Sequence, residues 1–305
     1  MNAIQTLLRG SIDYAGLFPP AGLDMATAAT NYERYRAGPN AWALGRFIVP
    51  VSRLPELEAV GSQLPHNPGG HPWRLGVLAG AELAADLTQI GEFNRRHSEP
   101  GRPVITADTV EVKAASENDI AEIIRLMPRG LQTYIEIPRE SDPYPLIAAM
   151  GELGGRAKVR TGGVTPDAFP STRDLLRFLH GCVRAGVPFK ATAGLHHPLR
   201  AEYGLTYAPD SPRGTMFGFL NLFLTVAFLR AGMNETEASL VLEEGSPEAF
   251  QADRSGISWR KHRLDLQSLR ALREDGIISF GSCSFTEPIQ DLEALHLLEP
   301  RTQRA

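Results

Sequence analysis

Short apolar segments alternate with longer amphipathic segments along most of the chain. Apolar runs of about five residues bounded by Gly or Pro are typical of buried strands. Eight runs fit this description: residues 12–15, 46–50, 74–79, 110–114, 133–138, 157–161, 188–193 and 277–281. The pattern therefore predicts eight strands.

Amphipathic helices are predicted between these strands. The clearest candidates are residues 25–36, 82–95, 119–127 and 173–185. In the last of them Leu175, Leu176 and Leu179 recur at helical spacing, which places them on one face. Ser171 followed by Asp174 indicates a capping box before this helix, and Gly186 stands where a helix would end.

Strands that alternate with helices favour a parallel sheet. Eight such units in 305 residues predict a single (β/α)8 barrel of the TIM type spanning residues 1–305. The extra length falls between strands seven and eight, where a helical insertion is expected at residues 199–276. This insertion is expected to hold helices at 216–229, 235–242 and 264–273, and a loop with Trp259. A doubly wound open sheet is the alternative fold.

The segment 216–229 is the most apolar part of the chain, and it is shorter than a membrane span requires. We expect a helix that is buried by its own domain or by a second subunit, because an exposed helix of this composition would leave a large apolar patch. A homo-oligomer formed through this helix is therefore one possibility.

The composition argues against several classes of partner. A net charge of −4 and an isoelectric point near 6.1 give no basis for binding nucleic acid or an anionic membrane. Two cysteines, Cys182 and Cys283, provide no disulfide framework, and the N-terminus lacks the apolar core of a signal peptide. A cytoplasmic location and no cofactor are expected.

Charged side chains occupy strands that are otherwise apolar. Residues two apart share a face of a strand, which groups these side chains in pairs. The pairs are Glu111 with Lys113, Tyr134 with Glu136, Lys158 with Arg160, and Lys190 with Thr192. Facing into a barrel, they would meet near the ends of the strands where active sites form. A structural ion-pair network is the alternative, although buried ion pairs add little net stability, which favours a functional set.

The loops after the strands supply candidate ligand-binding groups. Arg160, Thr161, Gly162 and Gly163 end one strand with a cation, a hydroxyl and backbone amides, and Gly281 with Ser282 ends the last strand. Such loops commonly bind phosphate or carboxylate in barrels. Asp13, at the end of the first strand, is expected to reach the same mouth, unless it only forms a turn.

His196 and His197 are adjacent, so at most one of them should face the site if the chain is extended there. His196 is predicted as a general acid or base, and capping of a carbonyl group is its alternative. A metal would need Glu136 or Cys283 as further ligands. Cys283 is expected to be a packed small residue, since no base for it is apparent.

Three segments resemble the last three strands of the deoxyribose-phosphate aldolase family. They are AKVRTGG at residues 157–163, FKATAGLHH at 189–197 and SFGSCSF at 279–285. The resemblance implies a class I aldolase on a (β/α)8 barrel. It implies that Lys158 forms the Schiff base, that Lys190 lowers the pKa of Lys158, and that Gly281 and Ser282 bind phosphate.

Two neighbouring ammonium groups also disfavour each other's protonation, so one lysine is expected to be partly neutral and nucleophilic. The leading hypothesis is a Schiff-base lyase or aldolase acting on a small anionic carbonyl compound. Its predicted catalytic residues are Lys158, Lys190, Glu136, Lys113 and His196. The alternatives are a metal-dependent lyase or isomerase with Glu and His ligands and a lysine base, and a non-catalytic anion-binding barrel.

Overall fold

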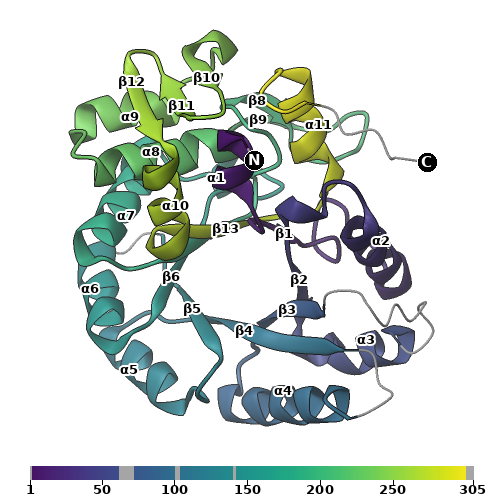
Figure 1. The fold of residues 1–305 in the computed structure, drawn as a ribbon. Coiled ribbons are helices and arrows are strands. Elements are labelled where there is room, and N and C mark those ends of the chain that lie inside the picture. The colour runs from purple at the N-terminus through teal and green to yellow at the C-terminus, as the bar shows by residue number, and fades with distance from the viewer. Residues whose placement is uncertain (1, 62–71, 100–103, 140–141, 300–305) are drawn as a thin grey trace.

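Eight parallel strands close into a barrel in the computed structural model, which describes residues 2–61, 72–99, 104–139 and 142–299 (Figure 1). The order around the barrel is β1, β13, β7, β6, β5, β4, β3, β2, and β1 pairs in parallel with both β13 and β2. The strands are β1 Ile12–Tyr14, β2 Leu44–Pro50, β3 Trp73–Leu78, β4 Ile105–Lys113, β5 Gln132–Glu136, β6 Arg156–Arg160, β7 Phe189–Thr192 and β13 Ile277–Ser282. The predicted closed parallel barrel is confirmed, and the open-sheet alternative is wrong.

Helices surround the strands, as Figure 1 shows for α2 to α7. The helices are α1 Ala3–Leu8, α2 Met25–Ala37, α3 Leu54–Gly61, α4 Leu83–His97, α5 Glu117–Leu126, α6 Pro143–Leu153, α7 Thr172–Ala185, α8 Phe219–Arg230, α9 Glu235–Glu243, α10 Leu266–Asp275 and α11 Thr286–Ala294. Four short 3₁₀ helices lie at Ala41–Ala43, Val51–Arg53, Pro166–Ala168 and Pro247–Ala249. The expected helices are present, whereas α1, α3 and α6 were not predicted.

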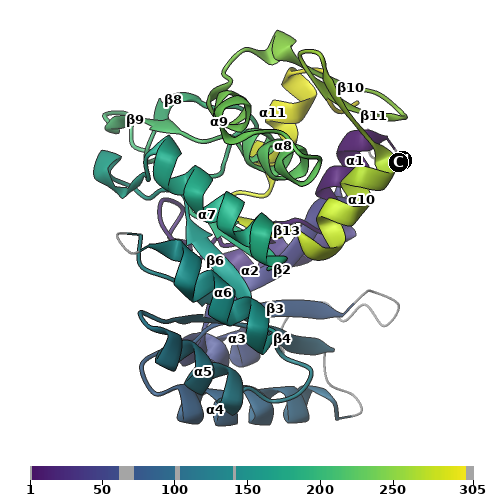
Figure 2. The ribbon, with the colours of Figure 1, turned by 90° about the vertical axis from the view of Figure 1, so that its left-hand side faces the viewer.

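The segment between β7 and β13 is less helical than expected. Besides α8, α9 and α10 it forms an antiparallel hairpin of β8 Ala201–Gly204 and β9 Arg213–Met216. It also forms an antiparallel sheet of β10 Phe250–Ala252, β11 Gly256–Trp259 and β12 His262–Asp265. The loop expected around Trp259 is therefore strand β11. Figure 2 shows this segment along one side of the barrel, outside β13 and beside α7, with the β8–β9 hairpin and strands β10 and β11 at opposite ends of that side.

Helix α8 is the apolar helix that the sequence predicts. Every residue from Phe219 to Leu229 is buried. The Phe219 ring stacks on Phe280 of β13 at a centroid distance of 4.8 Å, so α8 packs directly on the barrel. Burial by its own chain is confirmed, and the apolar face considered for contact with a second subunit is already covered. Within the described ranges, no helix combines the length and apolar character needed to cross a lipid bilayer.

Helix α7 begins after Ser171 and ends at Gly186 as predicted, but its N-terminus has a single side-chain cap in place of the predicted capping box. Ser171 Oγ accepts a hydrogen bond from the Asp174 backbone N–H at 3.1 Å and donates one to the Asp174 carboxylate at 2.6 Å. Gly186 ends the helix with a φ of 63°, a left-handed conformation that glycine adopts without strain. This cap positions α7 against the barrel between β6 and β7.

Replacing Ser171 with alanine is expected to lower the free energy of unfolding by about 1 kcal/mol, because the first turn of α7 loses its side-chain acceptor. Urea unfolding followed by circular dichroism measures the change. Ser239→Ala is the matched control, since Ser239 lies inside α9 and its hydroxyl only donates to the Thr236 carbonyl. Equal stability of Ser171→Ala and the wild type would show that the cap contributes nothing.

Candidate active site

One line of residues crosses four neighbouring strands at the same height. In the strand register Lys113 is opposite Glu136, Glu136 opposite Lys158, and Lys158 opposite Lys190. Residues opposite each other on neighbouring strands lie about 5 Å apart and point to the same side. The barrel thus brings together the charged residues that the sequence predicted would share its interior.

These side chains form a continuous chain of ion pairs inside the barrel. Lys190 Nζ lies 2.6 Å from Asp13 Oδ2 and 2.7 Å from Glu111 Oε1. Lys158 Nζ lies 2.7 Å from Glu111 Oε2 and 2.8 Å from Glu136 Oε2. We call Asp13, Lys190, Glu111, Lys158 and Glu136 the ion-pair chain. Three carboxylates alternate with two ammonium groups along it, so neighbouring charges are always opposite.

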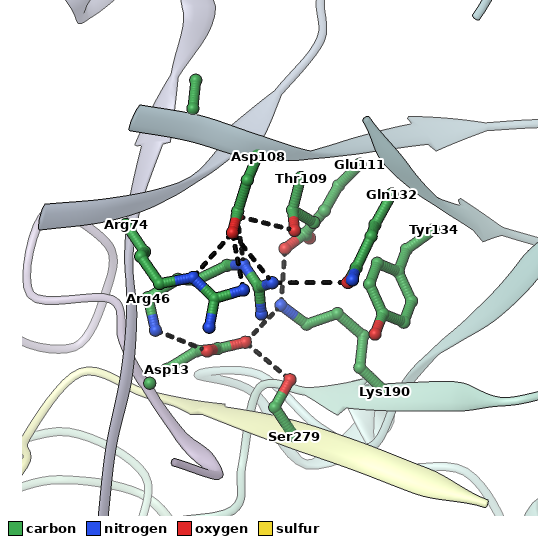
Figure 3. Close-up of polar contacts among 12 residues, drawn as sticks. Asp13, Arg46, Arg74, Asp108, Thr109, Glu111, Gln132, Tyr134, Lys190 and Ser279 are labelled. Atoms are coloured by element: carbon green, nitrogen blue, oxygen red, sulfur yellow. Dashed lines mark hydrogen bonds and ion pairs between the residues drawn. The ribbon is translucent and has the colours of Figure 1, made fainter. Parts of the chain in front are cut away.

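Lys190 is the inner lysine of this chain, with a side chain only 1% exposed (Figure 3). Its partner Asp13 is itself held by the Arg46 backbone N–H at 2.8 Å and by the Ser279 hydroxyl at 2.7 Å. Burial acts to lower the pKa of Lys190, but the carboxylates of Asp13 and Glu111 outweigh it and raise this pKa above its ordinary value. The carboxylates therefore favour the charged form of Lys190.

The lowered pKa that mutual repulsion would give is not found at Lys190, whose pKa the neighbouring carboxylates raise. Glu111 binds one ammonium group with each of its oxygens and so lies between them. Burial acts to raise the pKa of Glu111, yet Lys158 and Lys190 hold it down at about 2. Opposite charges therefore screen the two lysines from each other.

Lys158 is the outer lysine of the chain and the one that meets open space. A pocket of about 580 Å³ and a second of about 800 Å³ share four lining residues: Leu78, Glu111, Lys158 and Arg160. Lys190 lines neither of them. The two spaces form one mouth at the carboxyl ends of the strands, with the Lys158 amine on its floor.

The two parts of this mouth differ in character. The 580 Å³ pocket has mainly apolar walls, formed by Phe18, Pro19, Pro20, Ile48, Val164, Leu205 and Met216 among others. The 800 Å³ pocket is lined by Lys113, Glu136 and Arg160 beside Lys158. The Lys113 and Arg160 side chains are exposed, and neither side chain has a hydrogen bond or ion pair within the described part of the chain. Two cations are therefore available there to an anionic ligand.

The predicted binding loops contribute only in part. Gly163 and Gly281 line the 580 Å³ pocket. Thr161 is fully buried, and its hydroxyl donates to the Ala193 carbonyl at 2.6 Å, so it fastens β6 to the end of β7. Gly162 is packed against Phe169, where a Cβ atom would lie 2.4 Å from the ring. Gly162 and Thr161 thus shape the loop without lining the pocket.

Asp13 and Ser282 also differ from expectation. Asp13 is fully buried and binds Lys190, so it supports the floor of the mouth from below and does not reach the mouth itself. Ser282 is buried, and its hydroxyl accepts from the Ser284 N–H at 3.4 Å. Neither residue lines the two pockets.

A second cluster lies on the wall of the 580 Å³ pocket. His196 Nδ1 is 2.9 Å from Glu287 Oε2, and Cys283 Sγ is 3.8 Å from His196 Nε2. The Tyr207 hydroxyl is 3.4 Å from both Cys283 Sγ and Glu287 Oε2. We call these four residues the thiol cluster. Burial acts to lower the pKa of His196, but Cys283 and Glu287 outweigh it and raise this pKa to about 9.

Both histidines face helix α11, contrary to the expectation that at most one would face the site. His197 Nδ1 lies 2.6 Å from Asp291, and its ring stacks on Tyr203 at 3.6 Å. Asp291 follows Glu287 by one helical turn. The reason is a turn in the backbone: Ala193 and Gly194 have φ values of 65° and 72°, so the chain is no longer extended where the histidines begin.

Metal ligation was one alternative for these residues. Across the described ranges, no group of three or more His, Cys, Asp or Glu side chains is arranged to hold a metal ion. Both cysteines are free thiols. Cys283 has the neighbouring base that the sequence did not reveal, because His196 precedes it by 87 residues.

Glu287 and Tyr207 are the site residues that sequence reasoning missed. Glu287 lies in the first turn of α11 beside Pro288, and Tyr207 lies between the two strands of an unpredicted hairpin. Neither residue lies on a predicted strand or directly after one, so the sequence pattern did not mark either as a site residue. For Glu111 a signal existed, since it shares a strand face with Lys113, but it was not included among the catalytic candidates.

Comparison with known proteins adds no family to this picture. No family model matches the chain, and no curated protein matches it. The basis for a functional proposal is therefore the geometry of the mouth of the barrel and of the two clusters that line it.

Proposed function

We propose that this chain is a barrel enzyme that acts next to a carbonyl group through an imine formed by Lys158. The observation that carries the proposal is the position of Lys158, whose amine lies on the floor of the mouth between Glu111 and Glu136 at 2.7 and 2.8 Å. The resemblance to the deoxyribose-phosphate aldolase family implies the same residue as the imine-forming lysine.

Lysine usage supports a special role for these positions. The chain has 31 basic residues, and only Lys113, Lys158, Lys190 and Lys261 among them are lysines. Three of these four lie on barrel strands. Lys158 is opposite Lys190, and Glu136 lies between Lys113 and Lys158 in the strand register. Arginine cannot lose its proton in a protein, whereas a lysine amine can become a nucleophile.

The two carboxylates suit an imine as well as an ammonium ion. A protonated imine carries the same positive charge as the ammonium group it replaces, so Glu111 and Glu136 stabilise both. This cation withdraws electrons from the neighbouring carbon, which allows a carbon–carbon or carbon–hydrogen bond there to break. The same two carboxylates therefore also stabilise the reactive intermediate.

Glu136 is the proposed proton carrier. It takes a proton from the Lys158 ammonium group, and the neutral amine attacks the carbonyl carbon to form a carbinolamine. Glu136 then returns the proton to the carbinolamine hydroxyl, which leaves as water while the protonated imine forms. Both Glu136 and Glu111 line the mouth, but the Glu136 side chain is 11% exposed and that of Glu111 only 2%.

The proposed substrate is a small carbonyl compound with an anionic group. Arg160 and Lys113 would bind the anion, because both are exposed beside Lys158 without partners in the described part of the chain. Arg160 also offers a planar pair of donors that matches a carboxylate or phosphate. An apolar portion of the substrate would occupy the neighbouring 580 Å³ pocket.

Reductive trapping tests the proposal. The protein is incubated with pyruvate, glyoxylate or glyceraldehyde 3-phosphate and sodium cyanoborohydride, and intact mass and peptide maps are recorded. We expect the reduced substrate's mass on Lys158 for at least one compound, and no label there in Lys158→Met. Lys261, which is exposed on the insertion, is the internal control for random reaction.

Two results would overturn the proposal. One is labelling of Lys158 no faster than Lys261 with every compound. The other is turnover of a carbonyl substrate that persists in Lys158→Met. Turnover that a chelator removes, without trapping on Lys158, would favour the metal-dependent alternative.

A further inference from the structure

The thiol cluster takes no part in the proposed imine chemistry, although it lines the same pocket. Cys283 follows β13, His196 follows β7, Glu287 begins α11 and Tyr207 comes from the β8–β9 hairpin. Four separate segments thus meet in one cluster, in which His196 and Tyr207 contact the Cys283 sulfur. Cys283 and His196 are 6% and 7% exposed, so the contacts among them are largely protected from bulk water.

The arrangement is that of a nucleophile, a base and a group that orients the base. Cys283 Sγ lies 3.8 Å from His196 Nε2 and 3.9 Å from Nδ1, and Nδ1 is also engaged by Glu287 at 2.9 Å. Glu287 is in turn held by the Tyr207 hydroxyl. An imidazolium beside a sulfur stabilises the thiolate, which is the nucleophilic form of cysteine.

The other cysteine provides a contrast within the same chain. Cys182 lies inside α7, is 2% exposed, and burial alone raises its pKa well above the ordinary value. It lines neither pocket of the mouth. Cys182 thus has the environment of an inert core cysteine, and Cys283 does not.

We propose that Cys283, with His196 and Glu287, is a second reactive centre of the pocket that adds to carbonyl compounds carrying a conjugated carbon–carbon double bond. The thiolate sulfur forms a bond to the β-carbon while the double bond's electron pair moves toward the carbonyl group. The α-carbon then takes the proton held by His196. The addition needs no oxidant and no further reactant.

The pocket suits such a ligand. The walls of the pocket are mainly apolar, and a conjugated carbonyl is a soft, weakly hydrated electrophile that matches a thiolate. Cys283 contributes to a pocket of about 580 Å³, which is large enough for a small organic molecule. This inference does not depend on imine formation at Lys158.

N-ethylmaleimide, a conjugated carbonyl compound, tests the inference. The reduced, folded protein is treated at pH 7 with a small excess of the reagent, and the reaction is quenched over time and mapped by peptide mass spectrometry. We expect Cys283 to be modified at least tenfold faster than Cys182. In urea the two cysteines should react at equal rates, which shows that the fold causes the difference.

Variants identify the residues responsible. His196→Gln and Glu287→Gln are each expected to slow the modification of Cys283 about tenfold at pH 7, and Glu287→Gln serves if His196→Gln fails to fold. His180→Gln is the control, because His180 lies on α7 and pairs with Glu235.

The inference is overturned if Cys283 reacts no faster than Cys182 in the folded protein. It is also overturned if the folded His196→Gln and Glu287→Gln variants both react at the wild-type rate, because the thiol would then be accessible but not activated.

Discussion

Replacing Glu111 with glutamine is expected to lower the free energy of unfolding by about 3–5 kcal/mol, the range found when one partner of a buried ion pair is removed. Glu111 is the only member of the ion-pair chain that binds both lysines. Its loss leaves two buried ammonium groups with one carboxylate each and no negative charge between them. Urea unfolding at pH 7 measures the change.

A surface pair provides the matched control. Glu202 and Arg213 form an ion pair whose side chains are 63% and 60% exposed. Glu202→Gln removes the same charge in water and should cost at most about 1 kcal/mol. Equal stability changes in the two variants would mean that the ion-pair chain does not hold the barrel together.

The environment of Glu111 also predicts how the stability of the protein changes at acidic pH. The pKa of Glu111 is held at about 2, below its ordinary value of 4.5. A depressed pKa contributes stability that is present above pH 4.5 and is lost as the pH falls toward 2. The stability difference between wild type and Glu111→Gln should therefore shrink over this window.

The barrel was predictable because its signal is local. Each barrel strand is a short apolar run, and the alternation of such runs with helices indicates a parallel sheet. Helix α6 was not predicted because Pro143 and Pro145 occupy its first turn. Helix α3 was not predicted because its 8 residues are too few for a helical pattern to stand out. Both helices owe their stability to packing on the strands more than to their own sequence.

The insertion was harder to predict because its strands are short. Strands β8 to β12 have three or four residues each, which is too few for alternation to stand out. Their pairing depends on neighbours up to 15 residues away. As a result, Tyr207 could not be placed over the pocket from sequence.

The lysines could be predicted as a pair, but their protonation could not. Alternation along β6 and β7 placed Lys158 and Lys190 on the same side, and the register confirms that they are opposite each other. The partner that determines the charge of Lys190 is Asp13, 177 residues away on β1. Asp13 comes near Lys190 only because the barrel closes. A sequence argument limited to β6 and β7 therefore predicts a lowered pKa for Lys190, whereas the carboxylates raise it.

His196 should make the stability of the protein depend on alkaline pH. Its pKa is raised from 6.5 to about 9, and a raised pKa contributes stability that is complete below pH 6.5 and lost as the pH rises toward 9. A shift of this size corresponds to about 3 kcal/mol. The charged groups that face the ring are Glu287 and, when it is a thiolate, Cys283.

The measurement compares wild type and His196→Gln by urea unfolding at pH 6 and pH 9.5 under reducing conditions. Taking the difference between the two proteins removes the contribution of groups that titrate in this range without contacting His196. We expect this difference to fall by about 3 kcal/mol between the two pH values. Glutamine keeps a donor toward Glu287 but carries no charge at either pH. A difference that stays constant would mean that His196 has the same pKa in the folded and unfolded chain, and that the Glu287 contact does not stabilise the imidazolium.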